Sequence, residues 1–103
     1  MNSATFPVTA MVASFGISAC LGYPASHETF INQSAYWVGK SIFSLKRNSG
    51  PSYGIKKLPN GNMEEEWVEG LKCRGFYEYD TRTNIIVSWR FEGSATDCIS
   101  VAP

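Results

Sequence analysis

The sequence predicts an α+β domain in which two short N-terminal helices pack on an antiparallel sheet of about four strands, formed by two consecutive hairpins. Three observations carry this prediction. Apolar residues recur at helical spacing between residues 27 and 48, Asn60-Gly61 separates two strand-like runs, and apolar and polar residues alternate between 85 and 91. With 103 residues, the chain has room for one small domain.

The first helix is predicted over residues 27–37. Ser26 suits the N-cap position, and Glu28 places a negative charge in the first turn, where the helix dipole favours it. Gly39 ends this helix. The residues expected on its core face are Ile31, Ala35 and Val38, flanked by Phe30 and Trp37.

The second helix is predicted over residues 40–48 and stops before Gly50-Pro51. Lys46 and Arg47 lie near its C-terminal end, where cations interact favourably with the dipole. The residues expected to point toward the core are Ile42, Phe43 and Leu45.

The first hairpin is predicted from strands over 52–58 and 62–69, because Asn60-Gly61 favours a type I′ turn, which needs positive φ at both positions. When residues are paired outward from that turn, lysines of the first strand lie opposite glutamates of the second. These cross-strand ion pairs account for the acidic run 64–66 as a structural feature. The predicted pairs are Leu58 with Met63, Lys57 with Glu64, Lys56 with Glu65, and Gly54 with Trp67.

The second hairpin is predicted from strands over 74–79 and 85–91, joined by residues 80–84. Pairing Tyr79 with Ile85 brings Tyr77 to Val87 and Gly75 under Trp89. One face of this hairpin is strongly aromatic, and the two helices are expected to cover it.

The N-terminal region carries no charged residue between Met1 and Ser26 and contains a short apolar run that ends in Ile17-Ser18-Ala19-Cys20. Such a run closed by small residues is typical of a secretory signal peptide and is too short to span a membrane. The Ile-Ser-Ala-Cys sequence resembles a bacterial lipobox, whose cysteine becomes the lipid-bearing first residue. We therefore expect a signal peptide over 1–19, a lipidated Cys20 with a tether to residue 26, and one domain over 27–103.

The chain has three cysteines, an odd number for a disulfide-bonded protein. If Cys20 carries the lipid, Cys73 and Cys98 remain as a pair that an oxidising compartment would join. Two free buried thiols in a reducing compartment are the alternative.

Chemistry-bearing motifs are scarce. His27 is the only histidine, and neither CxxC nor HExxH spacing occurs, so we expect no metal, no cofactor and no catalytic residue. A hydrolase using His27 as base with Asp80 or Asp97 is the weakest alternative, because nothing resembles a nucleophile elbow. The net charge is zero, which disfavours nucleic acid as a partner.

Surface recognition is the remaining class of function, because Tyr and Trp are abundant and are favoured at protein interfaces. The first hairpin mixes apolar and charged residues and is therefore expected to provide the partner-binding surface. The predicted binding residues are Tyr53, Lys56, Lys57, Glu65 and Trp67.

Several short motifs follow one another in a fixed order along the chain. They include Ile17-Ser18-Ala19-Cys20, Leu58-Pro59-Asn60-Gly61, Tyr77-Glu78-Tyr79-Asp80, Trp89-Arg90-Phe91-Glu92-Gly93 and the terminal pair Cys73 and Cys98. Over residues 17–98, this order resembles small Gram-negative envelope lipoproteins with the helix-helix-sheet outline of BamE-type (SmpA/OmlA) outer-membrane assembly proteins and of β-lactamase-inhibitor-like domains. The resemblance implies an outer membrane location facing the periplasm, and Leu21 after Cys20 is similar to the outer-membrane sorting pattern.

Taken together, these features predict a lipid-anchored protein that acts as a binding or structural accessory subunit of an envelope complex, with an envelope protein as its partner. The alternative is a soluble secreted or periplasmic protein that works as an inhibitor or in the manner of an immunity protein.

Overall fold

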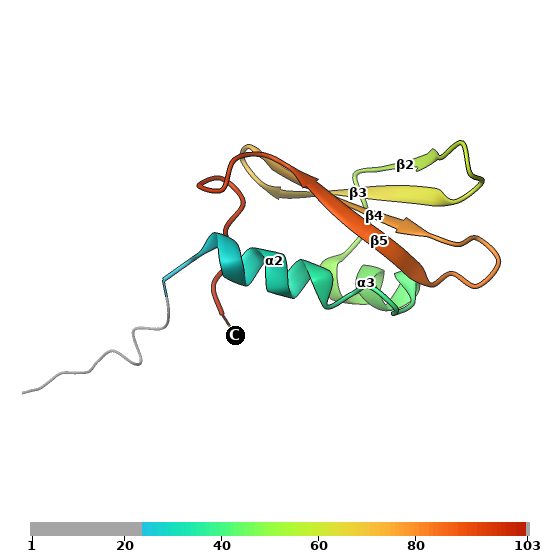
Figure 1. The fold of residues 1–103 in the computed structure, drawn as a ribbon, viewed down its shortest axis with the longest axis horizontal. Coiled ribbons are helices and arrows are strands. Elements are labelled where there is room, and N and C mark those ends of the chain that lie inside the picture. Colours follow the sequence, from blue (N-terminus) through green and yellow to red (C-terminus); the bar gives the residue numbers. More distant parts are fainter. Residues whose placement is uncertain (1–23, 103) are drawn as a thin grey trace, which may run out of the picture.

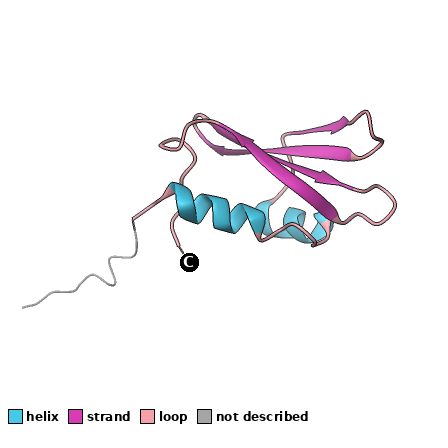
Figure 2. Ribbon diagram, in the orientation of Figure 1, coloured by secondary structure: helices cyan, strands magenta, loops and turns pink. Residues whose placement is uncertain are grey.

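The computed structural model describes residues 24–102, which form two helices followed by a four-stranded antiparallel sheet (Figures 1 and 2). The elements are α2 (His27–Ala35), α3 (Ile42–Ser49), β2 (Gly54–Lys57), β3 (Met63–Gly70), β4 (Cys73–Tyr79) and β5 (Ile86–Glu92). The strands lie side by side in the order β2-β3-β4-β5. The predicted α+β class and its element order are therefore confirmed. The expected signal peptide over 1–19 and Cys20 lie outside the described residues.

Serine side chains cap both helices as their N-terminal sequences require. Ser26 Oγ accepts a hydrogen bond from the Thr29 amide at 3.1 Å, and Ser41 Oγ accepts one from the Phe43 amide at 3.1 Å. Neither helix in the described part of the chain is long and apolar enough to cross a membrane.

The buried face of each helix differs from the sequence prediction. In α2, which ends at Ala35 and not at residue 37 as predicted, Phe30 and Ser34 are buried, whereas Ala35 and, beyond the helix, Val38 are exposed. The face is therefore turned by one residue, about 100° around the helix, which buries the large Phe30 ring in place of smaller side chains. In α3, Ile42 and Leu45 face the sheet, and Phe43 is exposed because it lies about 100° from Ile42 on the helix.

The register of the first hairpin is shifted by one residue from the prediction. The observed pairs are Gly54 with Glu66, Ile55 with Glu65, Lys56 with Glu64, and Lys57 with Met63. Gly61 has φ of 91°, but Asn60 has no positive φ, so the turn is not type I′. Pro59 sets the turn instead, because its fixed φ suits the second position of a type I turn, and Gly61 then adds a third loop residue.

The second hairpin shifts by two residues and keeps the predicted inner face at Trp89 and Phe91, whereas Ile86 is buried and Val87 is 47% exposed, the reverse of the predicted alternation there. Tyr77 pairs with Trp89 and Gly75 with Phe91, where the sequence predicted Val87 and Trp89. A bulge between Glu78 and Tyr79 brings Tyr79 opposite Ile86. A shift of two preserves the alternation of side chains, so the aromatic face still points toward the helices.

Both helices cover this one face of the sheet, and the core lies between the layers (Figure 1). One buried cluster joins α3 to the sheet, and a second joins α2 to the disulfide. The first contains Ile42, Leu45, Trp67, Tyr77, Tyr79 and Ile86, and the second contains Phe30, Cys73 and Cys98, with Trp89 and Phe91 packed against it.

The predicted cysteine pair forms a disulfide. Cys73, at the start of β4, is bonded to Cys98 with an S–S distance of 2.04 Å, and both residues are fully buried. The segment that follows runs back to the start of α2, where Ser26 and Ser100 exchange backbone hydrogen bonds of 2.9 and 3.0 Å. The bond therefore fastens the C-terminal segment to both layers of the domain.

Candidate functional site

The five residues predicted to bind a partner do not share one surface. Tyr53 is 70% exposed, and Lys56 and Lys57 are exposed on the edge strand β2. Glu65 has no exposed surface and Trp67 is 6% exposed, because both side chains point toward the helices. The exposed part of the predicted surface therefore consists of Tyr53, Lys56 and Lys57.

The acidic run 64–66 pairs with residues other than the predicted lysines. Glu64 accepts from Arg90 at 3.1 Å on the outer face of the sheet, where Glu66 also pairs with Arg74. Glu65 on the opposite face contacts Lys46 of α3. The one-residue register shift and the alternation of side chains along β3 separate these carboxylates onto two faces.

Glu65 is the centre of a buried polar cluster. Its Oε2 accepts hydrogen bonds from Lys46 Nζ at 3.0 Å and from the Tyr79 hydroxyl at 2.6 Å. Burial, followed by the adjacent Glu65 carboxylate, raises the pKa of Tyr79 above its ordinary value, so Tyr79 stays protonated and donates. This cluster links α3 to the sheet, and its role is structural.

A cavity of about 560 Å³ lies between the two helices and the sheet. Its volume is within the range of small-molecule sites. Aromatic and aliphatic side chains from both layers line it together with polar side chains such as Asn32, Ser34 and Asn48. The apolar members include Phe30 of α2, Trp37 after the end of α2, Leu45 of α3, Trp67 of β3 and Tyr77 of β4.

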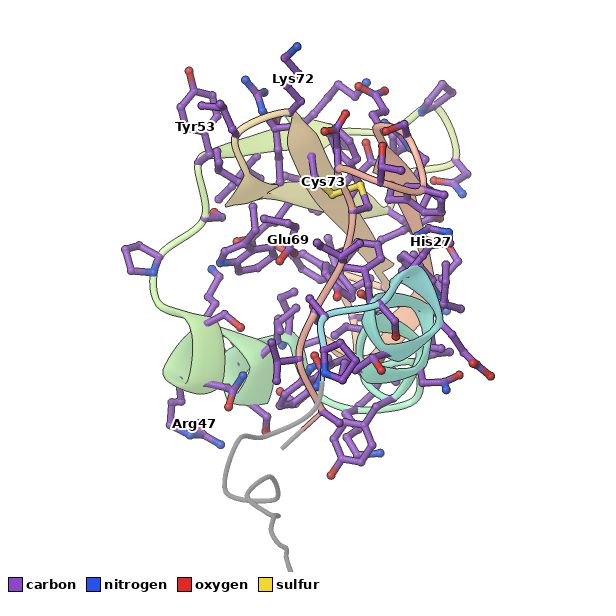
Figure 3. All side chains as sticks on the ribbon, turned by 90° about the vertical axis from the view of Figure 1, so that its left-hand side faces the viewer. His27, Arg47, Tyr53, Glu69, Lys72 and Cys73 are labelled. Carbon is purple, nitrogen blue, oxygen red and sulfur yellow. A yellow bond between two sulfur atoms is a disulfide. The ribbon has the colours of Figure 1, made fainter. Side chains whose placement is uncertain are left out.

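Glu69 contributes the single charged side chain among the residues that line this cavity. Figure 3 shows Glu69 beneath the sheet, between α3 and α2. Its Oε2 lies 2.6 Å from the point that a Cβ at Gly75 would occupy, so any larger residue at position 75 would displace the carboxylate. A glycine on the neighbouring strand therefore lets this carboxylate lie flat on the sheet.

Two titratable groups that line the cavity have shifted pKa values. Partial desolvation raises the pKa of the Glu69 carboxyl above its ordinary value of 4.5, although the residue as a whole is exposed. Burial also raises the pKa of Tyr77, a hydrogen bond with Ser34 opposes that shift, and the charge of Glu69 adds to it. No side chain of residues 24–102 forms an ion pair or hydrogen bond with the Glu69 carboxylate in the structure.

The sequence analysis placed Glu69 at the end of the predicted strand 62–69 and did not predict the cavity. The structure leaves Glu69 exposed. The alternation along β3 holds the signal that identifies it, since Glu69 shares a face with Trp67 and Glu65. That face became identifiable as the inner one only after the register and the positions of the helices were known.

We predict that Glu69→Gln raises the free energy of unfolding at pH 7 and has less effect at pH 4. A carboxyl whose pKa is raised by folding favours the folded state in acid, and this stabilisation is lost as the pH rises above 4.5 through the folded-state pKa. Urea denaturation at the two pH values measures the difference. Glu66→Gln, which alters a carboxylate paired with Arg74 on the outer face, is expected to raise stability at neither pH. Equal destabilisation by Glu69→Gln at both pH values would contradict the prediction.

His27 lies where the C-terminal segment meets α2. Its Nδ1 is 2.8 Å from the carbonyl oxygen of Cys98, and its ring contacts Phe91 edge-on with centroids 5.3 Å apart. The ring therefore links the start of α2 to the segment that carries the disulfide. Among residues 24–102, no three His, Cys, Asp or Glu side chains gather in a way that could hold a metal ion.

The fold and its cavity define a small disulfide-bonded α+β domain with an aromatic cavity that contains one carboxylate. No family model matches the chain, and no curated protein or solved structure matches it either.

Proposed function

We propose that this protein is an exported, lipid-anchored accessory subunit that acts by binding an envelope protein, in the manner of the BamE-type lipoproteins that its sequence resembles. The disulfide between Cys73 and Cys98 is the observation that carries the proposal. Disulfides persist in oxidising compartments such as the periplasm, and this one leaves Cys20 as the single remaining cysteine of the sequence.

The position of the first described residues suits a membrane anchor at Cys20. Pro24 is exposed and follows Cys20 by four residues, a stretch that spans roughly 14 Å when fully extended. The start of α2, the C-terminal end and the β3–β4 turn lie at one end of the molecule in Figure 1. An anchor at Cys20 would hold this end near the bilayer.

The opposite end would then face the periplasm and its proteins. The β2–β3 and β4–β5 turns lie there in Figure 1, and Lys57 immediately precedes the first of them. β2 is an edge strand whose side chains at Ile55, Lys56 and Lys57 are exposed. An exposed strand edge can pair with a strand of another protein, and lysines on it restrict unspecific pairing.

Expression in a Gram-negative host tests the anchor. We expect mass spectrometry to show a chain that begins at a lipidated Cys20, and fractionation to place it in the membrane. Cys20→Ala is expected to move the protein out of the membrane fraction, whereas Cys73→Ala/Cys98→Ala leaves the anchor in place. Cleavage at another position, or an unlipidated Cys20, would contradict the proposal.

The same fractionation separates the alternative function. A soluble inhibitor or immunity-like protein would occur in the periplasm or the medium without a lipid. A pull-down from envelope extracts with the intact lipidated protein then identifies the partner. Lys56→Glu/Lys57→Glu reverses the charge of the edge strand and is expected to weaken that capture, with Arg82→Glu, in the β4–β5 turn, as the matched control.

A further inference from the structure

The cavity between the helices and the sheet combines aromatic walls with one carboxylate. Trp67 and Tyr77 pack edge to face with their ring centroids 5.8 Å apart, and Tyr77 stacks on Trp89. These contacts fix the orientations of the rings that border the cavity. Tryptophan and tyrosine faces attract cations through the negative potential of the ring.

The charges around the cavity are unbalanced. Glu69 is the one charged residue among the described side chains that line it, and no Lys, Arg or His is among them. Glu69 is an exposed residue, so its carboxylate lies where the cavity opens to solvent and is available there to a cationic ligand. The Glu65 carboxylate on the same strand differs, since it is fully buried and already pairs with Lys46. Glu69 has no such residue, and the space beside it is empty of protein atoms.

From these observations we propose that the cavity is a binding site for a small monovalent organic cation, an ammonium group attached to an apolar ring or chain. Glu69 pairs with the ammonium group, and the rings of Trp37, Trp67 and Tyr77 surround the cation and the apolar part. The single carboxylate matches one positive charge. The volume of about 560 Å³ accepts an apolar substituent beyond the ammonium group itself.

The rim of the cavity provides a spectroscopic reporter. Trp67 Nε1 donates to the carbonyl oxygen of Gly50 at 3.1 Å, so its indole ring is held in place by a bond that does not involve the ligand. A ligand bound against this ring would change the indole resonance and the tryptophan fluorescence without needing to break that bond. The site does not depend on Cys20, so its test is independent of the anchor.

Titration of the full chain with benzyltrimethylammonium tests the proposal. We expect saturable binding with a dissociation constant on the order of 1 mM or lower, as the usual affinity per atom of a small ligand suggests. Shifts of the Trp37 and Trp67 indole N–H resonances locate the site. Neopentylbenzene, which has the same shape without the charge, is expected to bind at least tenfold more weakly, and phenylacetate is expected not to bind.

Two matched variants isolate the role of the carboxylate. Glu69→Gln is expected to weaken binding at least tenfold, and Glu66→Gln, which removes a carboxylate from the outer face of the same strand, is expected to leave it unchanged. Thermal unfolding of both variants shows whether they are folded at the temperature of the titration. Equal binding of the neutral analogue, unchanged affinity in folded Glu69→Gln, or no binding of the cation up to 10 mM, about ten times the expected dissociation constant, would overturn the proposal.

Discussion

Replacing Cys73 and Cys98 together with alanine is expected to lower the free energy of unfolding by about 3.5 kcal/mol. The bond joins residues separated by 25 positions, and the chain-entropy model assigns roughly this stabilisation to a loop of that length. A domain of this size has only about 4–12 kcal/mol of stability in total. The double variant is therefore expected to be close to the limit of folding at 37 °C.

The location of the bond adds to its effect. The chain beyond β5 returns to α2 through Cys98, whose carbonyl faces His27, and through Ser100, which pairs with Ser26. Without the disulfide, the C-terminal segment is held on α2 by these hydrogen bonds and by the one that Gln33 Nε2 donates to the Val101 carbonyl oxygen at 3.0 Å. Amide hydrogen exchange in the variant is expected to accelerate first at positions 98 and 100, ahead of the strands.

Urea denaturation of the oxidised wild type, the reduced wild type and the double variant measures the effect. The reduced protein and the variant are expected to lose similar stability, because both lack the same cross-link. Cys20→Ala serves as the control and is expected to leave the unfolding of the delipidated chain unchanged. A loss below about 1 kcal/mol in the double variant would show that the bond contributes much less than its loop length implies.

Lys46→Met is expected to lower the free energy of unfolding by about 3 kcal/mol, because it leaves the Glu65 carboxylate buried without its cation. Breaking a buried pair from one side usually costs 3–5 kcal/mol. The low end applies because the Lys46 side chain is 33% exposed and water screens part of the interaction. Methionine retains most of the apolar stem of the lysine, so the loss reports the charge.

A second substitution separates lost charge from lost packing. In Lys46→Met/Glu65→Gln the buried group is neutral, and the Gln carbonyl can still accept from the Tyr79 hydroxyl. Thermal and urea unfolding are expected to show the double variant more stable than Lys46→Met alone. Arg82→Met breaks the exposed pair with Asp80 and is expected to cause no measurable change in the free energy of unfolding. A double variant no more stable than the single one would contradict the charge explanation.

Local signals in the chain predicted the elements correctly. Ser26 capped the first helix, Gly50-Pro51 closed the second, and the alternating run 85–91 marked the last strand, which the structure places at Ile86–Glu92. These features act within a few residues of one another, so neighbouring sequence is sufficient to read them.

The candidate site could not be predicted from the sequence as well as the elements, because it depends on which face of β3 meets the helices. The predicted hairpin placed Lys56 opposite Glu65 and so explained the acidic run with local pairs. The turn set by Pro59 moves Lys56 opposite Glu64, while Glu65 pairs with Lys46 from a helix. A shift of one residue redistributes every cross-strand pair, and local spacing does not determine it when Pro-Asn-Gly permits two turns.

The sequence alone therefore determined the class of fold, the order of its elements and the Ser26 cap of the first helix, and it left the pairing of Cys73 with Cys98 as one of two alternatives. Tertiary structure decided the registers, the buried face of α2, the burial of Glu65 and the cavity around Glu69. The reason is the range of the interactions. Caps, turns and alternation are set by neighbours in the chain, whereas a cavity exists only where separate helices and strands pack incompletely against one another.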